Sequence, residues 1–115
     1  MGLFWWLPFG RVPEITAADL KRKLGKHGPL LVDVRTPGEF ASGHIKGASS
    51  MSISQLKRAL AAGDIEPSRE VVAVCLSATR SIPAVRLLQQ SGVQNAKQLA
   101  GGMRAWKGAG LPTTK

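Results

Sequence analysis

The sequence of 115 residues contains only one cysteine, Cys75. A single cysteine cannot form a disulfide within its own chain, which excludes a disulfide framework and fits a reducing compartment, where a free thiol survives. Long hydrophobic runs are also missing, since no apolar stretch approaches the roughly 20 residues that a helix needs to span a bilayer. We therefore expect a cytoplasmic protein, and a chain of this length predicts one domain that buries roughly two thirds of its extended-chain surface.

Acidic residues are missing from the C-terminal part of the chain. All seven carboxylates lie between Glu14 and Glu70, whereas residues 71–115 carry six basic residues and no acid. The formal net charge is +9, and an anionic substrate would be drawn to this half of the chain. No basic run is interleaved with aromatics and no nucleic-acid motif is present, so we expect no nucleic acid among the partners.

Aromatic residues are few, and the first ten residues hold two of the three Trp and two of the three Phe. This segment lacks the basic start and small-residue cleavage site of a signal peptide, and Trp6 breaks the myristoylation pattern. We expect residues 1–11 to form an aromatic arm beside one domain of residues 12–115. The arm either packs on the domain or contacts a membrane surface or a protein through Trp5 and Trp6, because Trp favours interfaces.

Hydrophobic patterning predicts helices and strands in alternation. Strands are predicted at residues 30–34, 48–53, 71–75 and 96–99, and helices at residues 16–26, 37–42, 54–62, 81–90 and 103–107. Such alternation is typical of βαβ units and predicts an α/β fold with a largely parallel sheet. In such sheets ligands bind beyond the carboxyl ends of the strands, which is where Cys75 falls.

Cys75 is the best candidate for a reactive residue because it stands between a predicted buried strand and a predicted helix. Ser81 is the predicted N-cap of that helix, with Pro83 in its first turn. Backbone N–H groups converge in a strand-to-helix turn, and together with the helix N-terminus and the charge of Arg80 they favour a thiolate. The alternative is a buried structural cysteine that acts as a small hydrophobic residue.

Several motifs together resemble the rhodanese-like domain family. The early signature covers residues 31–35 (LVDVR), 37–40 (PGEF) and 43–48 (GHIKGA), residues 74–81 are similar to the active-site loop, and residues 101–112 to the closing segment with Trp106. The resemblance runs from about Ile15 to Pro112. It implies a rhodanese-like three-layer α/β fold with a central, mostly parallel five-stranded sheet flanked by helices.

The resemblance also implies sulfurtransferase activity, with Cys75 as the catalytic residue. Cys75 would take the sulfane sulfur of a small anionic donor such as thiosulfate, become a persulfide, and pass the sulfur to cyanide or to the thiol of a small molecule or protein. No metal and no cofactor are implied. The loop whose N–H groups would hold the persulfide consists of Leu76, Ser77, Ala78, Thr79, Arg80 and Ser81.

Charged residues near this loop are expected to orient it. The resemblance implies that Arg80 pairs with a carboxylate, either Glu39 or Asp33, although a solvent-facing Arg80 is the alternative. Asp33 and Arg35 end a predicted buried strand at the same edge of the sheet as Cys75. They therefore either shape the pocket or pin loops by hydrogen bonds.

Histidine is not expected to take part in the chemistry. A thiolate attacks sulfur without a proton-abstracting base, which agrees with the lack of a histidine near Cys75 in the sequence. His44 matches a framework position of the family and is expected to fix a loop, with a role as an acid or base as the alternative, while His27 is expected in a surface turn.

Loop length favours sulfur transfer over related chemistry. Four residues separate Cys75 from Arg80, and in this family a six-residue loop goes with sulfur substrates, whereas the related phosphatases use a loop one residue longer. Phosphatase and arsenate reductase activities are lesser alternatives. A non-enzymatic persulfide-carrier or partner-docking module stays open, because Leu76 stands where many relatives carry Arg or Lys, and Ala78 where many carry Gly. The first change removes a cation near the pocket, and the second limits the backbone if that position needs a positive φ.

Overall fold

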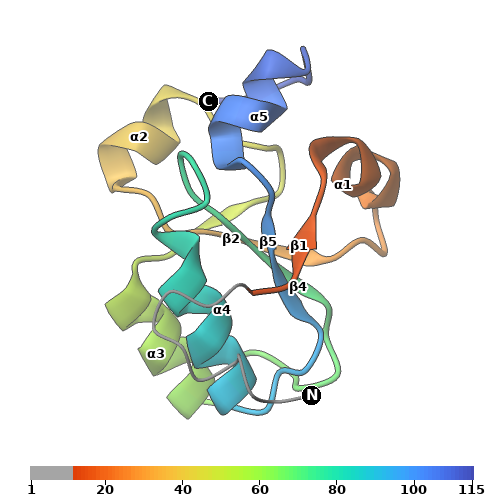
Figure 1. Ribbon diagram of the computed structural model, residues 1–115. Coiled ribbons are helices and arrows are strands. Elements are labelled where there is room, and N and C mark those ends of the chain that lie inside the picture. The colour runs from red at the N-terminus through yellow and green to blue at the C-terminus, as the bar shows by residue number, and fades with distance from the viewer. Residues whose placement is uncertain (1–11) are drawn as a thin grey trace.

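The computed structural model describes residues 12–115 of the chain (Figure 1). The expected aromatic arm of residues 1–11, with Trp5 and Trp6, lies outside these described residues, so its contacts stay a prediction. None of the helices within residues 12–115 is long and apolar enough to cross a membrane.

A sheet of five strands forms the middle of the fold (Figure 1). Its strand order is β1-β5-β4-β2-β3, and every pair of neighbouring strands is parallel. The strands are β1 (Glu14–Ile15), β2 (Leu30–Asp33), β3 (Ser49–Ser50), β4 (Val71–Val74) and β5 (Ala96–Leu99). The helices are α1 (Ala17–Lys23), α2 (Pro37–Ser42), α3 (Ile53–Ala61), α4 (Ser81–Gln90) and α5 (Gly102–Gly108). This arrangement confirms the predicted α/β fold with a five-stranded parallel sheet flanked by helices.

Helices cover both faces of the sheet because side chains alternate along each strand. One core cluster joins β4 to α3 and α4, and it contains Val71, Ala73, Leu56, Val85 and Leu88. The other joins β4 to α1 and α5, and it contains Val72, Val74, Leu20, Met103 and Trp106. Cys75 continues the alternation of β4 and therefore lies in the first cluster.

Two short strands differ from their prediction. β1 has only two residues, too few to show an alternating pattern, and the sequence does not predict it. The strand predicted over residues 48–53 is confined to Ser49–Ser50, and α3 begins at Ile53 rather than at residue 54. The earlier start follows from a capping box, in which Ser52 Oγ accepts a hydrogen bond from the Gln55 N–H (3.2 Å) and Gln55 Oε1 accepts one from the Ser52 N–H (2.8 Å).

The carboxyl ends of β2, β4 and β5 lie at the same edge of the sheet, because the strands are parallel neighbours. The chain leaves this edge after β4 at Cys75 and enters α5 after β5 at Gly102. Two hydrogen bonds join these segments, from the Met103 N–H to the Cys75 carbonyl (2.8 Å) and from the Arg104 N–H to the Leu76 carbonyl (3.0 Å). The start of α5 therefore anchors the start of the loop that follows β4.

Candidate active site

Cys75 is buried at the base of a tight loop between β4 and α4. The residue is only 1% exposed, and its Sγ lies 3.4 Å from Oγ of Ser81. Backbone N–H groups of Ser77, Arg80 and Ser81 also contact the sulfur. A set of N–H groups that converge on one atom is an anion-binding arrangement, so the loop is built to hold negative charge on this sulfur.

The environment of Cys75 makes its thiol more acidic than an ordinary cysteine. Burial raises the pKa of the thiol, but hydrogen bonding to Ser81 and to the backbone N–H groups of Ser77 and Arg80 outweighs burial, and the pKa is lowered. This is the direction that the sequence predicts from the strand-to-helix turn. A lower pKa increases the fraction of thiolate, which is the nucleophilic form.

Ala78 forms the turn of the loop in a conformation that favours glycine. Its φ is 70°, and no other residue except glycine has a positive φ in the described part of the chain. A left-handed conformation costs an alanine roughly 1–2 kcal/mol. Position 78 therefore does need a positive φ, a requirement that the sequence left open, and the loop holds Ala78 under strain.

Ser81 does not cap α4, so the prediction of its role as the N-cap is wrong. The N-cap position is Arg80, whose backbone is already helical (φ −71°, ψ −17°) and whose side chain makes no capping hydrogen bond. A capping side chain usually needs an extended backbone at that position, and the tight loop does not provide one. Ser81 is instead the first residue of the helix, and its buried hydroxyl donates a hydrogen bond to Oε1 of Gln98 (2.6 Å). Pro83 lies in the first turn, as predicted.

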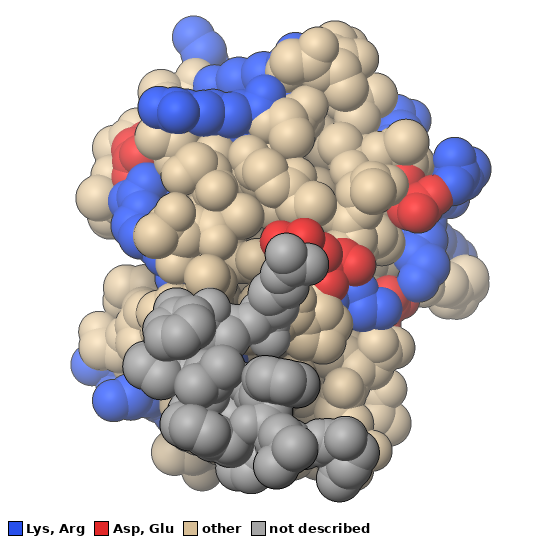
Figure 2. All heavy atoms as spheres, in the orientation of Figure 1, with Lys and Arg blue, Asp and Glu red and all other residues tan. Residues whose placement is uncertain are grey.

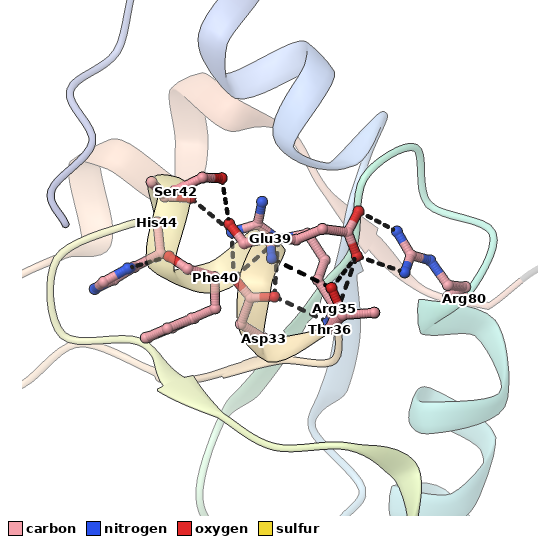
Figure 3. Close-up of polar contacts among 9 residues, drawn as sticks. Asp33, Arg35, Thr36, Glu39, Phe40, Ser42, His44 and Arg80 are labelled. Carbon is pink, nitrogen blue, oxygen red and sulfur yellow. Dashed lines mark hydrogen bonds and ion pairs between the residues drawn. The ribbon is translucent and has the colours of Figure 1, made fainter.

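Arg80 forms a bidentate ion pair with Glu39 of α2 and not with Asp33 (Figure 3). Nη1 donates to Oε1 (2.8 Å) and Nη2 donates to Oε2 (3.0 Å). Hydrogen bonds from Arg80 and from the Thr36 N–H lower the pKa of Glu39 to about 2, and the same pair raises the pKa of Arg80. Both side chains are partly exposed, at 44% and 32%. The guanidinium is therefore bound to a carboxylate, and the pair ties the end of the loop to α2.

Asp33 and Arg35 form a second ion pair, which is buried below α2 (Figure 3). Arg35 Nε lies 3.0 Å from Asp33 Oδ1, and Arg35 Nη2 lies 2.8 Å from Asp33 Oδ2. The same Nη2 also donates to the carbonyl of Gly43 (2.8 Å). The side chains are 3% and 0% exposed, so they act inside the protein, where they hold the segment after β2 to the segment after α2.

Neither histidine is among the groups that contact the sulfur of Cys75. His44 stacks on the ring of Phe40 (3.7 Å between centroids), and its Nδ1 lies 2.8 Å from the Phe40 carbonyl (Figure 3). Its backbone bonds to Thr114, which ties the C-terminal end of the chain to the loop after α2. His27 is exposed in a turn after α1.

Gly102 and Gln98 also hold the site together, although the sequence predicts no contact with the Cys75 loop for either residue. Gly102 packs so closely under the loop that a Cβ atom there would lie 2.4 Å from the carbonyl oxygen of Cys75. Gln98 is a buried polar residue, 3% exposed, and it binds the hydroxyl next to the thiol. Gln98 lies in the short strand predicted over residues 96–99, but nothing in the sequence shows which side chain it contacts.

The loop opens at the end of the domain that carries α2 and α5. In Figure 2, one group of Lys and Arg side chains lies at the upper left of the face shown, and most of the remaining surface at that end is uncharged. Within the loop, Leu76 and Ala78 are half-buried, while Ser77 and Thr79 are exposed. The loop itself carries one basic residue, Arg80, and the nearest acidic side chain that it contacts is Glu39 of α2.

The fold and the site together define an α/β domain with a buried thiol inside a loop of converging N–H groups, at the carboxyl edge of a parallel sheet. Comparisons with known proteins agree with this description. Residues 16–109 match the rhodanese-like domain family. The rhodanese-related protein of Thermoplasma volcanium has a solved structure that superposes with a TM-score of 0.78 at 29% identity, covering 90% of this chain and 98% of that one.

Relatives named as sulfurtransferases match most of the chain. A sulfurtransferase of Allochromatium vinosum is 36% identical over 102 residues, which cover 88% of this chain and 94% of that protein. Thiosulfate sulfurtransferase 16, chloroplastic, of Arabidopsis thaliana is 33% identical over 113 residues, with 90% and 94% coverage. A third relative, from Synechocystis sp. and with a name that states no activity, is 41% identical over 86 residues, and there the match spans 47% of the relative's length. The chain belongs to the rhodanese-like domain family.

Proposed function

We propose that this domain is a sulfurtransferase that moves a sulfane sulfur from a small anionic donor such as thiosulfate to cyanide or a thiol. The observation that carries the proposal is the Cys75 thiol, whose pKa is lowered by hydrogen bonds inside a loop of converging N–H groups. Relatives named as sulfurtransferases support the same activity at modest identity.

The proposed reaction has two displacements at sulfur. The Cys75 thiolate attacks the sulfane sulfur of thiosulfate, the S–S bond of the donor breaks, and sulfite leaves with the bonding electron pair. The product is a persulfide anion on Cys75. Cyanide or a thiolate then attacks the outer sulfur, which leaves as thiocyanate or as a new persulfide and returns the electron pair to Cys75. No proton has to be removed by a base in either step, provided that the thiol starts ionised.

The loop would stabilise the charge that both displacements place on sulfur. The N–H groups of Ser77, Arg80 and Ser81 already contact Sγ, and the outer sulfur of a persulfide would remain in the same positive environment. Arg80 orients this loop through Glu39 and so contributes to donor binding indirectly. Ala78 holds the turn in its strained conformation, which keeps the N–H groups aimed at the sulfur.

The test of this proposal is the rate at which thiocyanate forms from thiosulfate and cyanide. The wild-type domain should turn over, and Cys75→Ser should lose the activity, because a hydroxyl is a far poorer nucleophile toward sulfur and cannot carry a persulfide. Circular dichroism of both proteins would show that the serine variant keeps its fold. Activity near the wild-type level in Cys75→Ser would refute the assignment.

A second candidate function is a persulfide carrier or docking module that does not turn over small donors. Leu76 favours it, because an apolar side chain stands in the loop at a position where a cation would help to bind thiosulfate. Such a domain would accept sulfur from a protein partner and give no steady thiocyanate production. Loading of Cys75 by a persulfidated protein or small persulfide, together with no turnover of thiosulfate, would favour this candidate over the first.

A further inference from the structure

A chain of hydrogen bonds runs from the thiol of Cys75 to the first strand of the sheet. Cys75 Sγ lies 3.4 Å from Ser81 Oγ, and Ser81 donates to Gln98 Oε1 at 2.6 Å. Gln98 Nε2 in turn donates to Glu14 Oε2 at 2.8 Å. Ser81 and Gln98 are 0% and 3% exposed, whereas Glu14 lies in β1 at the surface. The chain therefore connects a buried nucleophile to an exposed carboxylate through two side chains that water does not reach.

The chemistry of these groups determines the direction of each hydrogen bond. An ionised carboxylate can only accept, so Glu14 requires the NH₂ group of Gln98 to face it. The amide oxygen of Gln98 then faces Ser81, and because this oxygen can only accept, the serine must donate its single hydroxyl hydrogen to it. The opposite amide orientation would place two acceptor oxygens 2.8 Å apart at Glu14.

One consequence concerns the sulfur. With its hydrogen used by Gln98, Ser81 can offer Sγ only a lone pair, which suits a thiol that donates S–H. A thiolate or persulfide has no hydrogen to give and needs donors. Ser81 becomes such a donor only when its hydroxyl turns away from Gln98. The hydrogen bond by which Ser81 lowers the pKa of the thiol therefore forms with the ionised sulfur, and it costs the short hydrogen bond to Gln98.

We propose that Gln98, oriented by Glu14, is a positioning residue that holds the hydroxyl hydrogen of Ser81 away from the sulfur of Cys75 in the resting domain. The hydrogen turns to the sulfur only when the negative charge there is large enough to compete with the amide oxygen. The inference rests on the proposed function, because it describes how readily the Cys75 thiol that would carry the sulfur loses its proton. It assigns to Gln98 and Glu14 a role in the reactivity of a thiol that neither of them touches.

Charged groups on the loop of Cys75 and on the elements packed around it must stay constant in a test. They are Arg80, the Asp33–Arg35 pair, Glu39, Lys57 of α3, Arg86 of α4, Lys97 of β5 and Arg104 of α5. The variants below leave all of them in place.

The test is the pH dependence of Cys75 alkylation by iodoacetamide in Gln98→Met. Cys75 is the only cysteine, so the rate reports one thiol. Methionine is similar in size to glutamine but offers no strong acceptor, which leaves the Ser81 hydrogen free to donate to the thiolate. The apparent pKa should fall by about one pH unit relative to the wild type, the size expected for one hydrogen bond to a charged group.

The same substitution in a Ser81→Ala background is the matched control. Without the hydroxyl, Gln98→Met should leave the apparent pKa of the Ser81→Ala protein unchanged, because Gln98 acts only through Ser81. Glu14→Gln is a second route to the same result at an exposed position, since it allows the Gln98 amide to turn over. Its shift should also be downward. Removal of the surface charge of Glu14 alone would lower the apparent pKa equally with and without Ser81. The part of the shift that is lost in the Ser81→Ala background therefore measures the effect that passes through Gln98 and Ser81.

Each outcome of the alkylation test either supports the proposal or overturns it. A downward shift that requires Ser81 supports the proposal, while no shift, an upward shift, or an equal shift with and without Ser81 would overturn it. Alkylation uses no sulfur donor, so the result is independent of the proposed function. A domain that fails to turn over thiosulfate but shows the Ser81-dependent shift would lose the function and keep this inference.

Discussion

The carbonyl oxygen of Cys75 lies 2.4 Å from the position that a Cβ atom of residue 102 would occupy. Gly102 has a φ of 59°, which also favours glycine. Its neighbours Met103 and Arg104 donate N–H hydrogen bonds to the carbonyls of Cys75 and Leu76. The loop that carries the thiol therefore rests on the first turn of α5, and only glycine lets the two backbones approach this closely.

Gly102→Ala should destabilise the domain by at least about 2 kcal/mol, because the clash with backbone and the positive φ both have to be relieved by moving the loop. Sulfurtransferase activity should fall with it. The matched control is Gly108→Ala in the same helix, where an added Cβ meets nothing within 4 Å. That control should be neutral or slightly stabilising, since alanine favours helix over glycine by about 1 kcal/mol. Chemical denaturation measures both changes, and equal stability of the two variants would contradict the role of Gly102.

Arg80→Ala should lower kcat/KM for thiosulfate by about tenfold or more, because the loop loses its tie to α2. Stability should change by less than about 1 kcal/mol, since the Arg80–Glu39 pair is partly exposed. Arg80→Lys should restore only part of the activity, because an ammonium cannot bind both carboxylate oxygens in the plane of the fork. Denaturation and steady-state kinetics on the three proteins give the comparison. An unchanged kcat/KM in Arg80→Ala would show that the ion pair does not serve the loop.

The Glu39 carboxylate should make stability depend on pH at the acid end. Its pKa is lowered from 4.5 to about 2 in the folded protein. Between these values the unfolded chain binds a proton that the folded protein does not, so the contribution of this group is present above pH 4.5 and is lost as the pH falls toward 2. Glu39→Gln and Arg80→Ala should each show a shallower fall in the free energy of unfolding over this range. A wild-type slope in both variants would contradict the pairing.

Leu76→Arg should lower the KM for thiosulfate by about twofold to fivefold, the size expected for one partly exposed charge interaction. The turnover number should change less, because a cation that binds donor and transition state equally improves affinity alone. The gain should shrink at high ionic strength, where the new charge is screened. Leu76→Gln is the neutral control and should leave KM and its salt dependence as they are. A KM for Leu76→Arg that shows no salt-dependent gain over the control would rule out the electrostatic explanation.

The sequence predicts the sheet and its flanking helices because long, regular segments carry the signal. Residues 71–74 form an apolar run bounded by charge, and they become the central strand β4 as expected. The sequence does not predict β1, because a strand of two residues shows no pattern of its own and is defined by its pairing with β5. The boundary between β3 and α3 is misplaced for a different reason, since two serines compete for the cap and the reciprocal bonds with Gln55 decide for Ser52.

Some features of the candidate site can likewise be predicted from the sequence, and others cannot. The position of Cys75 and the choice of Glu39 as one of two partners for Arg80 can be read from motifs, because these residues lie in segments with a recognisable order. The relationship of Ser81 to Gln98, and of Gly102 to Cys75, depends on distances across the sheet edge that no local pattern encodes. Ser81 shows the limit best, because its residue type predicts a helix cap while its actual partner is 17 positions away in the chain.

The central claim is that Cys75 carries a sulfur atom, and intact-mass spectrometry after incubation with thiosulfate tests it most directly. The wild-type domain should gain the mass of one sulfur atom, lose it again when cyanide is added, and show the added atom on the peptide that contains Cys75. Cys75→Ser should gain nothing. A wild-type protein that stays at its starting mass, or a serine variant that gains the same mass, would contradict the account.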